Sequence, residues 1–156
     1  MSRSKPFTSS FLARCMLLAT AALSSVHAQE KENAVQLVTA INGEISTLSL
    51  EEAAQLFLGH RTTLRDGTPV TLIDLPSGLV RNQFYQLLTG KNPVQVRAYW
   101  SRLVFSGRVR PPLEASNQAE ARELLAKNPN AIGYLPVGAA DAKLKVLFKL
   151  PITATN

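Results

Sequence analysis

Residues 70–84, Val-Thr-Leu-Ile-Asp-Leu-Pro-Ser-Gly-Leu-Val-Arg-Asn-Gln-Phe, contain the change from strand to helix around which the rest of the chain is arranged. The first six residues are mostly apolar and β-favouring, which predicts a buried strand, and Pro76 ends it. Apolar residues then recur at helical spacing, at Val80, Phe84, Leu87 and Leu88. The stretch therefore predicts a strand, a tight loop and a helix.

The loop of this stretch is a candidate anion site. Ser77 is a good helix N-cap, and Gly78 allows a backbone or a ligand to approach closely. A helix N-terminus offers N–H groups without intrahelical acceptors and the positive end of the helix dipole. Arg81, one turn later, would add positive charge. The same pattern is also typical of an ordinary strand–helix connection with no ligand.

The first 28 residues have the pattern of a secretory signal peptide. Three basic residues precede or flank an apolar core at 15–23, and Val26-His27-Ala28 resembles a cleavage site. The apolar core is shorter than the roughly 20 residues that a membrane span needs. We therefore expect residues 1–28 to be removed, and residues 29–156 to form one periplasmic domain with no membrane span.

Removal of this segment changes the chemistry of the chain. Cys15 is the only cysteine, so the mature chain would have neither a disulfide nor a thiol site. His60 would be its only histidine. The formal charge falls from +6 for the full sequence to +3, because 14 basic and 11 acidic residues remain. The working protein is thus less basic than the whole sequence indicates.

Strand and helix signals alternate along the remaining chain. Strands are predicted at residues 35–41, 70–75, 131–135 and 144–148. Helices are predicted after the capping box Ser49-Leu-Glu-Glu52, from Gly78 to Gly90, from Asn92-Pro93 to Gly107, and from an N-cap at Ser116 to Asn128. Pro111-Pro112 predicts an extended connection. This alternation favours an α/β domain with a mixed sheet flanked by helices.

Catalytic and metal sites have little support in the sequence. With one histidine and no cysteine, the mature chain lacks the ligands of the common zinc sites. It contains no Gly-x-Ser-x-Gly elbow, no Walker-type loop and no dinucleotide-binding glycine loop. We therefore expect neither an enzyme nor a cofactor or a metal.

Charge is distributed unevenly. No acidic residue occurs between Asp74 and Glu114, and the interval contains Arg81, Lys91, Arg97, Arg102, Arg108 and Arg110. Folded onto one face, these side chains would form a positive surface beside the helix N-terminus; a solvated basic face without a ligand is the alternative. Nucleic acid is not expected as a partner, because aromatic and basic residues do not alternate as in a base-stacking platform.

Several short elements in a fixed order carry a resemblance to a known family. They are Leu48-Ser-Leu-Glu-Glu, Phe57-Leu-Gly59, Asp66-Gly67, Ser77-Gly78 with Phe84, Tyr99-Trp100, Phe105-Ser-Gly107, Pro111-Pro112 and Ala131-Ile-Gly-Tyr134. From about Val35 to Phe148 the chain resembles the substrate-binding proteins of phosphate ABC transporters, which are type 2 periplasmic binding proteins. Trp100 within this pattern is expected to belong to the core.

The resemblance implies a single lobe of a protein that normally closes two lobes on an anion. In the family, the second lobe binds phosphate with a Ser-Gly-Thr run at a helix start and an arginine shortly before it. Ser77 and Gly78 match this run, Leu79 stands in place of the threonine, and Ile73 or Asp74 lies near the position of the arginine. Arg81 would take over that role if its side chain turned back toward the helix N-terminus.

Two functions follow from these observations. In the first, phosphate or a similar small oxyanion binds at Ser77, Gly78, Leu79 and Arg81. In the second, the domain has kept the fold without the ligand site, and recognises a membrane transporter, a receptor or a second lobe from another chain. The absence of half of the clamp favours the second function, and the helix N-terminus favours the first.

Overall fold

The computed structural model describes residues 34–107 and 109–150. The expected signal peptide at 1–28 lies outside these residues. The described chain forms five strands and four helices in an α/β arrangement, as the sequence predicted. Among the described residues, the helices are all too short or too polar to cross a membrane.

One mixed sheet forms the centre of the domain, in the order β3-β2-β4-β1-β5. Its strands are β1 (Val35–Ala40), β2 (Thr71–Asp74), β3 (Leu113–Glu114), β4 (Ala131–Pro136) and β5 (Leu144–Lys149). β1 pairs antiparallel with β4 and with β5, whereas β2 pairs parallel with β3 and with β4. The loop at Ser77 directly follows the carboxyl end of β2.

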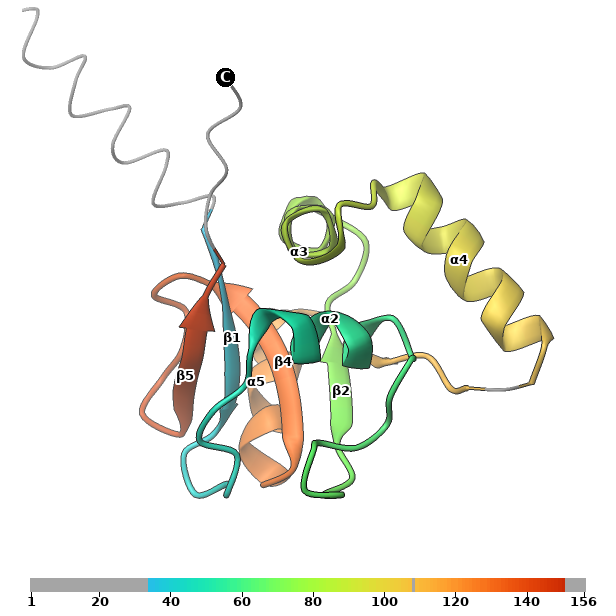
Figure 1. Ribbon diagram of the computed structural model, residues 1–156. Coiled ribbons are helices and arrows are strands. Elements are labelled where there is room, and N and C mark those ends of the chain that lie inside the picture. The colour runs from blue at the N-terminus through green and yellow to red at the C-terminus, as the bar shows by residue number, and fades with distance from the viewer. Residues whose placement is uncertain (1–33, 108, 151–156) are drawn as a thin grey trace, which may run out of the picture. The chain divides into compact units, whose positions relative to one another are not determined.

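Helices cover both faces of the sheet, which explains why every residue of β1 is buried. Figure 1 shows α2 (Leu50–Phe57) and α5 (Gln118–Lys127) on opposite faces. The core is completed by α3 (Leu79–Thr89), which follows β2, and by one face of α4 (Pro93–Phe105), which packs on α3.

Aromatic side chains from three elements fill the space between α2, α3 and β4. The Phe84 and Tyr134 rings stack with centroids 3.6 Å apart, and Phe57 meets Phe84 edge-on at 4.7 Å. All three side chains are buried. This cluster packs α2 and α3 against β4, which lies beside β2 in the sheet.

Several local predictions are confirmed. Ser49 and Glu52 form a capping box at the start of α2, and Asn92 forms one with Gln95 at the start of α4, with Pro93 in the first turn. Gly90 ends α3 with φ of 70°, in the left-handed conformation that glycine adopts easily. Trp100 belongs to the core, as expected.

Two predicted N-caps are wrong by one residue. The N-cap of α3 is Gly78 rather than Ser77, because helical geometry begins only at Leu79. The N-cap of α5 is Asn117 rather than Ser116, since the Asn117 side chain accepts from two first-turn N–H groups. Strand β3 was predicted only as an extended connection, and its pairing with β2 depends on tertiary structure.

Candidate functional site

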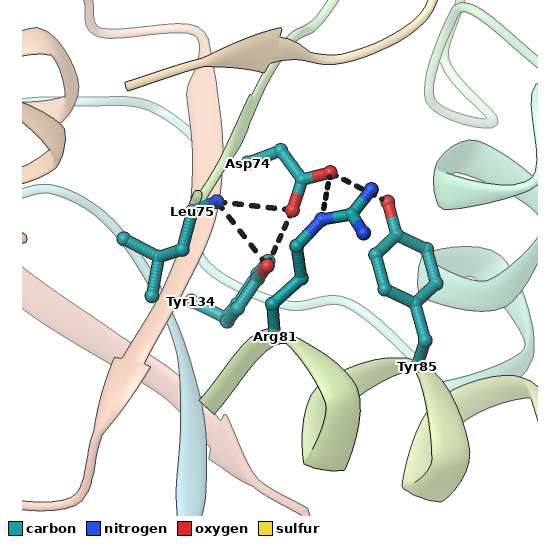
Figure 2. A network of polar contacts seen from close by, with 5 residues as sticks. All are labelled: Asp74, Leu75, Arg81, Tyr85 and Tyr134. Atoms are coloured by element: carbon teal, nitrogen blue, oxygen red, sulfur yellow. Dashed lines mark hydrogen bonds and ion pairs between the residues drawn. The ribbon is translucent and has the colours of Figure 1, made fainter. Parts of the chain in front are cut away.

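A buried carboxylate organises the end of β2. Asp74 is 3 % exposed, and its two oxygens accept hydrogen bonds from four donors (Figure 2). Oδ1 accepts from the Leu75 N–H at 3.0 Å and from the Tyr134 hydroxyl by a short hydrogen bond. Oδ2 accepts from the Tyr85 hydroxyl at 3.1 Å and from Arg81 Nε at 3.0 Å. Asp74 is thus satisfied within the protein.

The three side-chain donors around Asp74 come from two elements that the fold brings together. Arg81 and Tyr85 lie four residues apart, on the same face of α3, and both point back toward the end of β2 (Figure 2). Tyr134 comes from β4, which lies beside β2 in the sheet. The pairing of β2 with β4 therefore places the Tyr134 hydroxyl next to the Asp74 carboxylate, although the two residues lie 60 positions apart in the sequence.

Burial sets the ionisation of this network. Burial raises the pKa of both tyrosine hydroxyls, and the Asp74 charge raises each pKa further, so both remain protonated donors in neutral solution. Burial acts to lower the pKa of the Arg81 guanidinium, but the charge of Asp74 and its hydrogen bond with Arg81 outweigh this effect and leave the pKa raised. Arg81 therefore stays charged beside Asp74.

A cavity of about 460 Å³ lies next to this network. We call it the α3–α4 cavity. Its lining residues come from the end of β2, from α3, from α4 and from the segment before and within β3: Asp74, Ser77, Arg81, Val96, Arg97, Trp100, Ser101, Val104, Pro111, Pro112 and Glu114. Polar groups at the end of β2 and apolar groups of α4 thus share one concave surface.

The four residues predicted to bind a ligand divide into two pairs. Ser77 and Arg81 both line the α3–α4 cavity. Gly78 and Leu79 do not line it; both are exposed, Leu79 at 66 %. Because Gly78 is the N-cap and supplies no side-chain hydrogen bond, the first turn of α3 has no side-chain cap. Ser77 lines the cavity and does not serve as a cap.

Arg81 turns back toward the helix N-terminus, which is the orientation that a role in ligand binding requires. Its Nε is engaged with Asp74, and its guanidinium lies 5.1 Å from the centre of the Tyr85 ring. Among the described residues, no acceptor is recorded for its two Nη groups. Arg81 therefore has a structural role through Nε, and its two Nη groups can still donate hydrogen bonds.

Residues of the basic interval line two adjoining hollows. Arg81 and Arg97 line the α3–α4 cavity, and Arg110 lines a hollow of about 970 Å³ that shares Pro111, Pro112 and Glu114 with that cavity. Lys91 lies beyond the C-terminal end of α3, with Nζ 5.8 Å from the centre of the Tyr99 ring. Arg81, Arg97 and Arg110 therefore lie around adjoining hollows, and the single positive surface stays a prediction.

The larger hollow adjoins the α3–α4 cavity but is not lined by residues at the start of α3. It is lined by Arg61, Arg110, Thr62, Thr71 and Glu114 together with apolar residues of α2, β2 and β3. Among residues 34–107 and 109–150, no group of three or more histidine, cysteine, aspartate or glutamate side chains is arranged to hold a metal ion.

Sequence reasoning missed the central residue of the site. Asp74 was considered only as a neighbour of the missing arginine, and Tyr85 was not singled out. Of the network, the sequence pointed only to Arg81, as a candidate site residue, and to Tyr134, as part of the Ala-Ile-Gly-Tyr element that carried the resemblance.

Comparison of the sequence with protein-family models finds no match, and neither does comparison with curated proteins. Solved structures do match. One is a protein of Clostridium perfringens described as a phosphate ABC transporter substrate-binding protein, with bound phosphate; the TM-score is 0.58 at 17 % identity, over 73 % of this chain and 44 % of that one. This chain has a substrate-binding-protein fold.

Two further structures share this substrate-binding-protein fold. An ABC-type phosphate transport receptor from Vibrio cholerae matches with a TM-score of 0.57 at 16 % identity, over 73 % of this chain and 45 % of that one. PstS from Borrelia burgdorferi matches with a TM-score of 0.56 at 17 % identity, over 74 % and 46 %. The chain spans less than half the length of these proteins, which agrees with the single lobe expected from the sequence.

Proposed function

We propose that this protein is a non-catalytic, periplasmic binding module that recognises phosphate or a similar small oxyanion at the start of α3. The observation that carries the proposal is that the first turn of α3 has no side-chain cap, while Ser77 and Arg81 meet in the adjoining cavity. A helix N-terminus of this kind binds anions through its N–H groups and its dipole.

The fold supports this proposal. A phosphate ABC transporter substrate-binding protein and a phosphate transport receptor share it, at 17 % and 16 % identity. We further propose that residues 1–28 are a cleaved signal peptide and that residues 29–156 form the working domain. A single lobe leaves its ligand partly exposed, so the affinity is expected to be weak unless another protein covers the site.

Isothermal titration calorimetry tests this function. The full sequence is expressed, and the protein is purified in the form that the cell makes from it. Saturable heat is expected with phosphate, and Ser77→Ala is expected to weaken binding about tenfold or more, because it removes a hydrogen bond to a charged group. Ser46→Ala changes an exposed serine in the loop before α2 and is the matched control. The mass of the purified protein shows whether residues 1–28 have been removed.

Two results would contradict the proposal. Absence of heat with phosphate and with sulfate at millimolar concentration would mean that the lobe has no oxyanion site of its own. Equal binding by the wild type and Ser77→Ala would place the site elsewhere. Arg81→Ala is unsuitable as a binding test, because it also removes the partner of the buried Asp74.

A second candidate function, recognition of another protein, is favoured by the outer face of α4. Val94 and Phe105 are exposed there, with Phe105 at 95 %. Exposed aromatic and aliphatic side chains on one helix are typical of an interaction surface. A membrane transporter, a receptor or a lobe from another chain would be the partner in this case.

Chemical cross-linking in the producing cell tests the second function. The wild type is expected to form a defined adduct, and Val94→Ser combined with Phe105→Ser is expected to remove it, because the change takes away apolar contact area. The double variant should still bind phosphate, since neither residue lines the α3–α4 cavity. An adduct that survives both substitutions would show that α4 is not the contact surface.

A further inference from the structure

We propose that α4 binds the surface of a membrane that contains anionic lipids, as a helix that lies along the surface without crossing it. This binding would use the outer face of α4 and would need no ligand at the start of α3, so it is independent of oxyanion binding. It gives the outer face a different occupant from the protein partner of the second candidate function.

The outer face of α4 is exposed along its length. Nine of the thirteen residues of α4 are exposed, and the side that is buried in the domain carries Val96 and Trp100. Figure 1 shows α4 beside α3, at the end of the domain opposite β5. The outer face can therefore contact a surface without any change in the core.

Apolar side chains form a stripe on this face. Val94, Ala98 and Phe105 are all exposed, and the helical repeat places them together on the side away from Val96 and Trp100. We call these three residues the outer stripe. Phe105 is 95 % exposed and Val94 is 76 % exposed. Side chains of this kind leave water when a helix lies at a lipid interface.

Arginines lie on both sides of the outer stripe. Arg97 and Arg102 are exposed, and the helical repeat places one on each side of the stripe, with Arg97 also at the wall of the α3–α4 cavity. An arginine stem can lie along an apolar surface while its guanidinium group reaches a phosphate. A helix that lies in a membrane interface has this arrangement, with apolar side chains toward the acyl chains and basic side chains at the headgroups.

The charge around α4 has one sign. No acidic residue occurs in α4 or anywhere else between Asp74 and Glu114. Lys91 precedes the helix, and Arg110, which is exposed, follows it. An anionic lipid surface attracts each basic residue that comes near it. The outer face of α4 is therefore complementary to a surface that is both negative and apolar.

This charge pattern distinguishes between three occupants. A second copy of α4 is disfavoured, because it would bring arginines against arginines with no acidic residue on either helix. In a protein interface, charges of complementary sign fix the register of the partners. Charges of one sign beside an apolar stripe fix no register, which suits the uniform negative charge of an anionic bilayer.

Flotation with lipid vesicles tests the proposal. The purified protein is mixed either with vesicles of equal parts phosphatidylglycerol and phosphatidylcholine, or with vesicles of phosphatidylcholine alone. Binding to the anionic vesicles is expected to be about tenfold tighter or more, because several basic residues lie near the surface. Added salt should weaken this binding, since it screens the charges.

Two variants of α4 make the test specific. Arg97→Gln combined with Arg102→Gln should weaken binding to the anionic vesicles about thirtyfold, because each basic residue near the surface contributes roughly fivefold. Phe105→Ser should weaken it severalfold, since the exposed ring no longer leaves water. Circular dichroism shows whether each variant has kept the fold.

Matched controls lie at the opposite end of the domain. Lys143→Gln combined with Lys149→Gln removes two exposed positive charges at and before β5, and Val146→Ser removes an exposed apolar group of β5. Neither control should change binding to the vesicles. All variants share residues 1–33 with the wild type, so a difference between them comes from the substituted positions.

Several results would overturn the proposal: equal binding to neutral and anionic vesicles, no binding to either, or binding that survives both α4 variants. A cross-linked adduct that is lost in the arginine variant, without any binding to vesicles, would show that an acidic protein occupies this face. Millimolar free phosphate at constant ionic strength should not displace the protein from the vesicles. Displacement would place the lipid phosphate at the start of α3, which overturns this proposal and supports the oxyanion function.

Discussion

Replacement of Asp74 by alanine is expected to lower the free energy of unfolding by about 3–5 kcal/mol, the range measured when one partner of a buried ion pair is removed. The change leaves the Arg81 guanidinium half-buried without its counter-ion, and it leaves the Tyr85 and Tyr134 hydroxyls without an acceptor. Urea denaturation followed by circular dichroism measures the effect. If the slope of the unfolding free energy against urea concentration is unchanged, the substitution has changed stability alone.

Two further variants make this prediction specific. Glu44→Ala removes an exposed carboxylate and should change stability by no more than about 0.5 kcal/mol. Tyr134→Phe removes one donor to Asp74 and should cost about 1 kcal/mol while keeping the aromatic packing. The network would not be a centre of stability if Asp74→Ala cost no more than Glu44→Ala, or if Tyr134→Phe had no effect.

Replacement of Gly78 by aspartate is expected to reduce phosphate affinity on the order of a hundredfold while the fold remains at least as stable. The new carboxylate would cap the first turn of α3 and interact favourably with the helix dipole, adding up to about 1 kcal/mol of stability. The same carboxylate would occupy the N–H groups that the anion needs and would repel it. Titration and thermal unfolding of the same sample measure both effects.

The structure provides a matched control for this change. Gly78 has φ of 167°, which is extended backbone that any residue adopts, and an added Cβ would meet only the Pro76 carbonyl oxygen, at 3.8 Å. Gly78→Ala should therefore fold normally and retain most of the phosphate binding. Retained phosphate binding in Gly78→Asp would show that the anion does not use the start of α3.

The local signals of the sequence were sufficient for most of the elements. The capping boxes at Ser49 and Asn92, and the glycine at the end of α3, each involve residues a few positions apart, so their geometry does not depend on the rest of the fold. Helical periodicity likewise identified the buried faces that contain Phe84 and Trp100. The errors at Ser77 and Ser116 are single-residue shifts at helix ends: Asn117 takes the N–H groups that Ser116 was expected to cap, whereas α3 begins one residue later than expected and has no side-chain cap.

The candidate site is less local. Ser77 and Arg81 were found from the sequence because a strand followed by a helix start is a recognisable anion site, and the structure places both in one cavity. Gly78 and Leu79 were taken from the same pattern, but they lie outside that cavity. The sequence spacing alone did not determine which side of the helix start would be concave.

The sequence by itself determined the alternation of strands and helices, the helix caps and the strand–helix junction at residues 70–84, because these depend on interactions between near neighbours. Only the tertiary structure decided that Asp74 would meet Tyr134, since this contact requires the parallel pairing of β2 with β4. It also decided that Arg81 would be held by Asp74, and that α4 would close a cavity over the start of α3. These features depend on the burial of a charge and on long-range packing, and neither leaves a periodic pattern in the sequence.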